Sequence, residues 1–140
     1  SEAGKRLVGL FRREIFEEVA KSDLAGLIFT FVWALDQKAD WDYVEEVCGI
    51  FESRGAEVYF VELEADLDER LSRNLSPNRL QHKPTKRNTE WSENELKTSM
   101  EKYRLNSYDG EIKRENYLRI NNTDLSAEEV ARQIKHEFGL

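Results

Sequence analysis

Residues 26–33 read Gly-Leu-Ile-Phe-Thr-Phe-Val-Trp and contain no charged side chain. Apolar residues follow one another here, without the alternation of apolar and polar residues that marks a strand with one face in water. A short uninterrupted apolar run is typical of a strand that is covered on both faces, as in a parallel sheet between layers of helices. We therefore expect Gly26–Trp33 to form an inner strand of an α/β domain.

The rest of the chain alternates between expected helices and expected strands. Residues 57–63 and 116–120 read as two further buried strands, and apolar residues recur at helical spacing in the segments around them, including 5–21 and 40–54. Three later helices open with a capping-box pattern: Asp66 with Glu69, Ser92 with Glu95, and Ser126 with Glu129. Strands joined by crossover helices predict a three-layer α/β fold built on a parallel sheet.

Composition limits the class of protein. Hydrophobic residues make up 39% of the chain and charged residues 35%, which is typical of one globular domain rather than a disordered chain. Cys48 is the single cysteine, so no internal disulfide can form, which fits the reducing cytoplasm. No apolar run reaches the roughly 18 residues of a membrane helix, and the net charge of −7 argues against a general nucleic-acid binder.

The charge is unevenly distributed along the chain. Six of the 21 basic residues lie between positions 70 and 89, where there is no acidic residue; the other 15 face all 28 acidic residues, so the remainder carries −13. We call residues 70–89 the basic segment; its charged members are Arg70, Arg73, Arg79, Lys83, Lys86 and Arg87. Positive charge concentrated on an acidic body predicts a site for a phosphate-bearing small molecule. A solvated basic loop without a ligand is the alternative.

The arginines of the basic segment suit phosphate, because a guanidinium group stays charged and donates two parallel hydrogen bonds. Arg70 and Arg73 are three residues apart and therefore lie on one face of an expected helix. They could contact a ligand together, or pair with nearby acidic residues. Those acidic residues are Asp66, Asp68 and Glu69. Arg79 and Arg87 lie in a stretch that contains two prolines and therefore cannot be one continuous helix.

Two parts of the chain resemble one family. Residues 117–131, Tyr-Leu-Arg-Ile-Asn-Asn-Thr-Asp-Leu-Ser-Ala-Glu-Glu-Val-Ala, resemble the last strand, turn and helix of shikimate-kinase-like and adenylate-kinase-like proteins, which belong to the P-loop small-molecule and nucleotide kinases. Residues 58–74 resemble the preceding strand of these kinases and the arginine-bearing lid helix that follows it. The resemblance implies a P-loop NTPase-like fold with a helical lid over residues 70–104.

The resemblance also implies an activity. The expected reaction is transfer of the γ-phosphoryl group of ATP, with Mg²⁺, to a hydroxyl or phosphate group of a small metabolite. Arg70, Arg73, Arg79 and Arg87 would close over the transferred group as catalytic residues. Of these, Arg79 and Arg87 are the better candidates for a phosphate clamp, because a mobile lid excludes water when it closes.

Two further groups belong to the expected site. By resemblance, the turn formed by Asn121, Asn122 and Thr123 lies beside the adenine of the cofactor; the alternative is a purely structural turn before the last helix. Asp36 follows the first expected strand, at the carboxyl end of a parallel sheet, where ligands bind. It could orient water on Mg²⁺ or deprotonate the acceptor, or it could be a helix cap or an ordinary loop acid. No cysteine and histidine spacing indicates a metal site in the protein itself.

The chain departs from this family at one point. P-loop kinases hold ATP with a Gly-x-x-x-x-Gly-Lys-Ser/Thr motif, and no such motif occurs in this sequence, in which Gly4-Lys5 is the only Gly-Lys pair. We therefore expect a first strand and its P-loop to be missing on the N-terminal side. Residues 1–140 are then expected to be one N-terminally incomplete domain.

The sequence thus predicts an ATP-dependent phosphotransferase that binds a nucleotide and a small-molecule substrate, with no nucleic-acid or membrane partner. Two alternatives stay open. One is a non-catalytic module that binds an anion or a nucleotide through the basic segment. The other is an interaction protein whose exposed Trp91 and basic segment dock an acidic partner.

Overall fold

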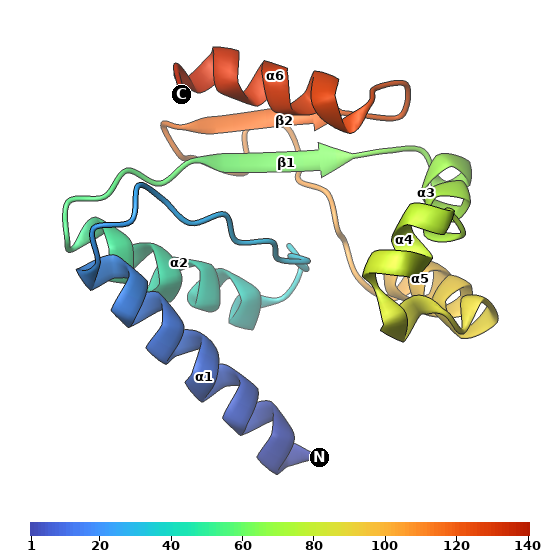
Figure 1. Ribbon diagram of the computed structural model, residues 1–140, viewed down its shortest axis with the longest axis horizontal. Coiled ribbons are helices and arrows are strands. Elements are labelled where there is room, and N and C mark those ends of the chain that lie inside the picture. Colours follow the sequence, from blue (N-terminus) through green and yellow to red (C-terminus); the bar gives the residue numbers. More distant parts are fainter. The chain divides into compact units, whose positions relative to one another are not determined.

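A computed structural model describes residues 1–140, and most of the chain is helical (Figure 1). In chain order the elements are α1 (Glu2–Lys21), α2 (Lys38–Glu52), β1 (Phe60–Glu64), α3 (Leu67–Asn74), α4 (Pro77–His82), the 3₁₀ helix η1 (Pro84–Lys86), α5 (Thr89–Lys102), β2 (Tyr117–Asn121) and α6 (Ala127–Phe138). Contacts between residues divide the chain into two compact units. Unit 1 comprises Ser1–Trp33 and Gln37–Val58, and unit 2 comprises Ala34–Asp36 and Tyr59–Leu140.

The expected three-layer parallel sheet of a P-loop NTPase-like fold is wrong. The sheet has only two strands, β1 and β2, and the run Gly26–Trp33 belongs to no strand. An apolar run in the sequence indicates burial and does not identify a partner strand. It shows that a segment prefers to be covered, but a ladder of hydrogen bonds also needs the backbone of a neighbouring strand. Residues 26–33 form no such ladder.

Unit 1 is built from α1 and α2, which pack together around aromatic side chains. Phe16 is buried, and its ring meets those of Phe29 and Phe51 edge-on, with centroids 5.0 Å and 6.1 Å apart. The ring of Tyr43 lies 5.2 Å from that of Phe31. The expected helices 5–21 and 40–54 are confirmed, apart from small shifts at their ends. The apolar stripe of α1 is largely exposed, at Leu7, Leu10, Phe11 and Ile15.

Unit 2 contains the sheet. β1 and β2 pair in parallel, in register from Phe60 opposite Tyr117 to Glu64 opposite Asn121. Parallel pairing requires a long crossover, and α3, α4 and α5 all lie within it. α6 runs beside β2 (Figure 1), where Ile120 and Val130 are buried. The two expected strands at 57–63 and 116–120 are therefore confirmed as elements, each displaced slightly along the chain.

Only one of the three expected capping boxes forms. Ser126 and Glu129 cap α6 reciprocally, as the sequence predicts. Asp66 stands at the N-cap of α3, but its side chain makes no capping hydrogen bond. α5 begins earlier than expected, with Asn88 accepting a hydrogen bond from the Trp91 backbone N–H at 3.1 Å. Ser92 is thereby released from capping and takes another role.

Candidate functional site

The basic segment is held by a group of three helices. α3 follows β1 almost directly, and Figure 1 shows α3, α4 and α5 grouped beyond the carboxyl end of that strand. A buried polar pair joins α3 to α5: Asn74 Nδ2 donates to Ser92 Oγ at 2.9 Å, and the Ser92 hydroxyl can donate back to Asn74 Oδ1 at 3.2 Å. Only 1% of Ser92 is exposed, so both partners depend on each other for hydrogen bonding. The arginines of the segment therefore project from a fixed scaffold.

Arg79 and Arg87, the expected clamp residues, are oriented by the protein but left without an acidic partner. Arg79 Nε donates to Asn74 Oδ1 at 3.2 Å, and Arg87 Nε donates to the carbonyl oxygen of Leu80 at 3.2 Å. No hydrogen bond or ion pair involves the terminal Nη1 and Nη2 groups of either arginine, and both side chains are exposed. Because Leu80 follows Arg79 on α4, the second bond brings Arg87 to the helix that carries Arg79. Each guanidinium thus keeps a free pair of parallel donors.

Arg73 is used differently, because all its nitrogen atoms have partners within the protein. Nε donates to Glu69 at 2.7 Å, Nη1 donates to Asn122 Oδ1 at 2.9 Å, and Nη2 donates to the carbonyl oxygens of Asn122 and Thr123 at 2.6 and 3.2 Å. The pairing with a nearby acid that the sequence left open is therefore realised for Arg73. The side chain ties α3 to the turn after β2, which fixes the base of the basic segment against the sheet.

Arg70 lies one helical turn before Arg73 and is half-buried. Its Nη1 lies 3.2 Å from the sulfur of Met100, a weak acceptor on α5. No carboxylate lies within ion-pair distance of Arg70. The structure therefore does not place Arg70 and Arg73 in equivalent positions, although their spacing predicts one face.

The two lysines of the basic segment also differ. Lys86 forms an ion pair with Glu95 at 2.7 Å, and its ammonium lies 5.3 Å from the centre of the Trp91 ring. Lys83 is exposed and has no acidic partner. Of the six basic residues between 70 and 89, only Arg73 and Lys86 are paired with a carboxylate. Most of the positive charge of the segment is therefore not neutralised within the protein.

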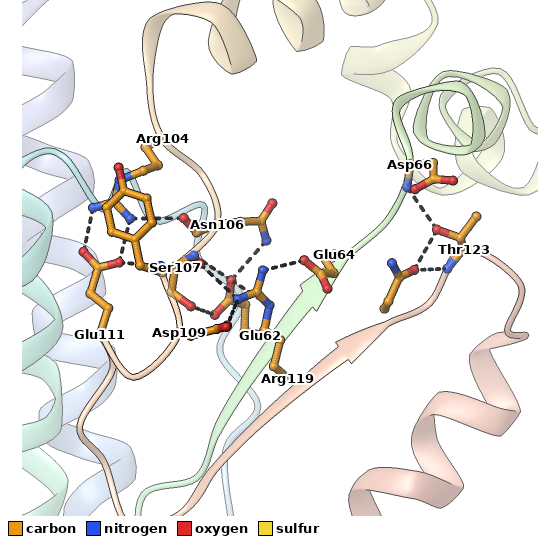
Figure 2. A network of polar contacts seen from close by, with 12 residues as sticks. Glu62, Glu64, Asp66, Arg104, Asn106, Ser107, Asp109, Glu111, Arg119 and Thr123 are labelled. Atoms are coloured by element: carbon orange, nitrogen blue, oxygen red, sulfur yellow. Dashed lines mark hydrogen bonds and ion pairs between the residues drawn. The ribbon is translucent and has the colours of Figure 1, made fainter.

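The turn expected beside adenine is occupied by internal hydrogen bonds. Asn121 Oδ1 accepts from the backbone N–H and the hydroxyl of Thr123, at 3.1 and 2.7 Å. Thr123 Oγ1 in turn accepts from the Asp66 backbone N–H at 3.0 Å (Figure 2). Asn122 accepts hydrogen bonds from Arg73 with its side-chain and carbonyl oxygens. This pattern agrees with the structural alternative for the turn, and a role beside adenine stays a prediction.

Asp36 is also engaged within unit 2. Its Oδ1 accepts a hydrogen bond from the Arg104 backbone N–H at 3.2 Å, and the neighbouring Leu35 N–H donates to the Arg104 carbonyl oxygen at 2.8 Å. The carboxylate thus helps to anchor residues 34–36 beside the end of α5. Trp33 and Trp41, which flank Asp36 in the sequence, pack edge-on in unit 1 with centroids 4.6 Å apart. A role of Asp36 near an acceptor stays a prediction.

The most extensive polar network of unit 2 surrounds Glu62 on β1, and the sequence analysis did not foresee it. Figure 2 shows Glu62 facing Asn106 and Ser107, and the carboxylate also accepts from the Tyr117 hydroxyl on β2. The four bonds to Glu62 have lengths of 2.6 to 3.0 Å. Arg119, also on β2, pairs with Glu64 at 2.7 Å. The available signal was a pair of charged residues, Glu62 and Arg119, each flanked by apolar residues within its strand.

This network alters the acid–base properties of its members. Partial burial raises the pKa of the Glu62 carboxyl, but hydrogen bonds from Ser107, Tyr117 and Asn106 outweigh it and lower that pKa from 4.5 to about 2. Burial and the hydrogen bond to Glu62 raise the pKa of the Tyr117 hydroxyl. The Arg104 guanidinium, paired with Glu111 at 2.6 Å, lowers the pKa of that carboxyl. Glu62 is therefore ionised at neutral pH and serves as an acceptor that anchors the loop after α5.

Clusters of potential metal-ligand side chains were sought in the structure. No group of three or more histidine, cysteine, aspartate or glutamate side chains is placed to hold a metal ion. Magnesium binds in proteins through one or two carboxylates together with substrate phosphates and water. A role for ATP and Mg²⁺ therefore stays a prediction.

Unit 1 contains a separate hollow between α1 and α2. Its volume is about 370 Å³, and two of its lining residues, Arg13 and Glu46, form an ion pair at 3.1 Å. The lining residues are Arg6, Gly9, Leu10, Arg13, Phe16, Tyr43, Glu46, Val47 and Ile50. None of the site residues expected from the sequence lies there.

Comparison of the chain with models of protein families, with curated proteins and with solved structures finds no significant match. The resemblance to P-loop kinases therefore stays a prediction from the sequence. Among the helices, none is both long and apolar enough to cross a membrane.

Proposed function

We propose that the basic segment binds the phosphate groups of a nucleotide or a phosphorylated small molecule, as the arginine-bearing part of a phosphotransferase. The observation that carries the proposal is the state of Arg79 and Arg87. In both, Nε is held by a neutral oxygen, while the terminal nitrogens have no partner. A side chain prepared in this way loses less conformational freedom on binding an anion than a mobile one.

Two further observations support the proposal. The helices that carry the basic segment follow the carboxyl end of a parallel strand, where ligands of α/β proteins bind. The remainder of the chain carries −13, so a small anion that approaches the protein is attracted to this segment and repelled elsewhere. A solvated loop without a ligand would not require the two Nε anchors.

Transfer of a phosphoryl group from ATP to a small metabolite is the finer part of the proposal. Its support is the resemblance of residues 58–74 and 117–131 to lid-bearing kinases. Phosphoryl transfer also needs a cradle for the phosphates and Mg²⁺, and the sequence has no Gly-x-x-x-x-Gly-Lys motif to form it. We therefore assign phosphate binding, and not a complete reaction, to these residues. The cytoplasm, which the single cysteine favours, is the proposed compartment.

Calorimetric titration with pyrophosphate and with ATP tests this function. Arg79→Ala and Arg87→Ala each remove one fork, and we expect each to weaken binding about tenfold, equivalent to about 1.4 kcal/mol. Arg12→Ala is the matched control, because it removes the charge of an exposed arginine on α1 in unit 1. The melting temperature should not change in any of the three variants.

The pattern across the variants decides between the possible results. Weaker binding of pyrophosphate by Arg79→Ala and by Arg87→Ala, but not by Arg12→Ala, supports the site. Equal loss in all three variants would reflect only the net charge and would refute a specific site. Binding that survives both changes would remove the basic segment from the function. Arg79→Lys separates geometry from charge, since a lysine retains the charge without the fork.

A further inference from the structure

Trp91 is the only tryptophan of unit 2, and it follows the basic segment directly in the sequence. It stands in the first turn of α5, where its backbone N–H donates to Asn88 Oδ1 at 3.1 Å. Arg87 precedes Trp91 by four residues, and four residues of chain span at most about 14 Å. The capped turn therefore places an aromatic side chain within a short distance of one of the two arginines whose terminal nitrogens have no partner.

The ring of Trp91 is oriented by contacts within unit 2 but is not buried by them. The Lys86 ammonium lies 5.3 Å from the centre of the ring and 2.7 Å from Glu95, which follows Trp91 by one turn of α5. The lysine is therefore held by the ring and the carboxylate together, and a cation over an aromatic ring is a favourable contact. Even so, 51% of Trp91 is exposed. The ring keeps apolar surface on which a planar group can stack.

The proposed function leaves open whether the ligand is a nucleotide or another phosphorylated small molecule. We infer that it is a nucleoside phosphate, whose base stacks on Trp91 while its phosphate groups bind Arg79 and Arg87; this inference rests on the proposed function. One ribose joins the base of such a molecule to its phosphates, which suits the short separation of Trp91 from Arg87. A sugar phosphate without a base would use the arginines alone.

The distribution of charge matches the two halves of a nucleoside phosphate. The cation beside the ring, Lys86, is neutralised by Glu95, as suits an uncharged base. Arg79 and Arg87 are oriented by neutral oxygens and keep their charge for phosphate. Stacking on an aromatic side chain tolerates any base, because every base has a π face. The inference therefore specifies the class of ligand and not the identity of its base.

Calorimetric titration with AMP and with ribose 5-phosphate tests the inference, because these two ligands have the same phosphate and differ only in the base. We expect the wild-type protein to bind AMP about tenfold more tightly. Trp91→Leu should abolish this preference, whereas Trp91→Phe, which keeps a ring and disturbs α5 least, should retain most of it. Tyr108→Leu is the matched control, because it removes another exposed aromatic residue of unit 2 and should leave the preference unchanged. Pyrophosphate, which has no base, should bind equally well to the wild-type protein and Trp91→Leu.

The results separate this inference from the function on which it rests. Equal affinity of the wild-type protein for AMP and ribose 5-phosphate would overturn the inference and leave Trp91 for a protein partner. A preference for AMP that survives in Trp91→Leu would overturn it as well. Neither result affects the proposed function as long as pyrophosphate binding still depends on the two arginines. Pyrophosphate that binds equally well to the wild-type protein, Arg79→Ala and Arg87→Ala would refute the proposed function, and the inference with it.

Discussion

Replacement of Glu62 by glutamine tests the network that joins β1, β2 and the loop after α5. The carboxylate accepts four hydrogen bonds, and only 11% of the side chain is exposed. Glutamine keeps the shape and one acceptor oxygen, but it removes the charge and turns the second acceptor into a donor. The neutral amide therefore imitates a protonated Glu62. We expect the free energy of unfolding to fall by about 3 kcal/mol at pH 7, the value of a pKa difference between 4.5 and about 2.

The effect of this replacement should depend on pH in a defined direction. The folded-state pKa of Glu62 lies below its value in the unfolded chain, so the stabilisation is complete above pH 4.5 and is lost as the pH falls towards 2. Between these two pKa values the stabilisation by the Glu62 carboxylate decreases with pH, and about 1 kcal/mol of it remains at pH 3. The difference between the wild-type protein and Glu62→Gln should therefore shrink by about 2 kcal/mol between pH 7 and pH 3.

Urea unfolding at several pH values measures this difference, with hydrogen exchange of the Phe60–Glu64 amides as a reporter that lies within unit 2. Other carboxylates also titrate over this range, but they do so in both proteins and cancel in the difference. A difference that stays constant from pH 7 to pH 3 would refute the reasoning, because the charge of Glu62 would then contribute nothing. Equal stability of the two proteins at pH 7 would refute it as well.

Two further changes test other parts of unit 2. Asn74→Ala leaves the buried Ser92 hydroxyl without its partner and removes the hydrogen bond that orients Arg79. We expect amide exchange in α5 to become faster, with an opening free energy lower by about 2 kcal/mol, and pyrophosphate binding to become weaker. Unchanged exchange would contradict the role of the buried pair. Ser126→Ala removes the cap of α6 and should cost about 1 kcal/mol in the urea unfolding free energy, and no loss would show that Glu129 caps the helix unaided.

The sequence predicted the elements of this protein better than their assembly. Helices such as α1 and α2 follow from local periodicity, and the Ser126 capping box is a contact between residues three apart, which sequence reasoning can reach. The sheet depends on contacts between distant residues. Two apolar segments formed a parallel pair, but Gly26–Trp33, with the strongest strand signal, did not join them. Apolar periodicity reports a preference for burial and contains no information on the partner.

The Glu62 network shows the same limit for polar contacts. Its partners at Ser107 and Tyr117 lie 45 and 55 residues further along the chain. No spacing rule connects positions so far apart, because the crossover through α3, α4 and α5 determines which loop returns to β1. A charged residue inside a buried strand shows that some partner must exist, since an unpaired buried charge is costly. Only the fold identifies it.

For the candidate site, the sequence identified the group of arginines but not their separate roles. Arg73 forms an ion pair with Glu69 and hydrogen bonds with the turn after β2, whereas Nε of Arg79 donates to the side-chain oxygen of Asn74. The difference lies in the acceptor. A carboxylate neutralises the guanidinium that it orients, whereas an amide or a carbonyl oxygen, as for Arg79 and Arg87, orients it and leaves the full charge for a ligand. The neutral anchors therefore favour Arg79 and Arg87 as the phosphate ligands of this chain.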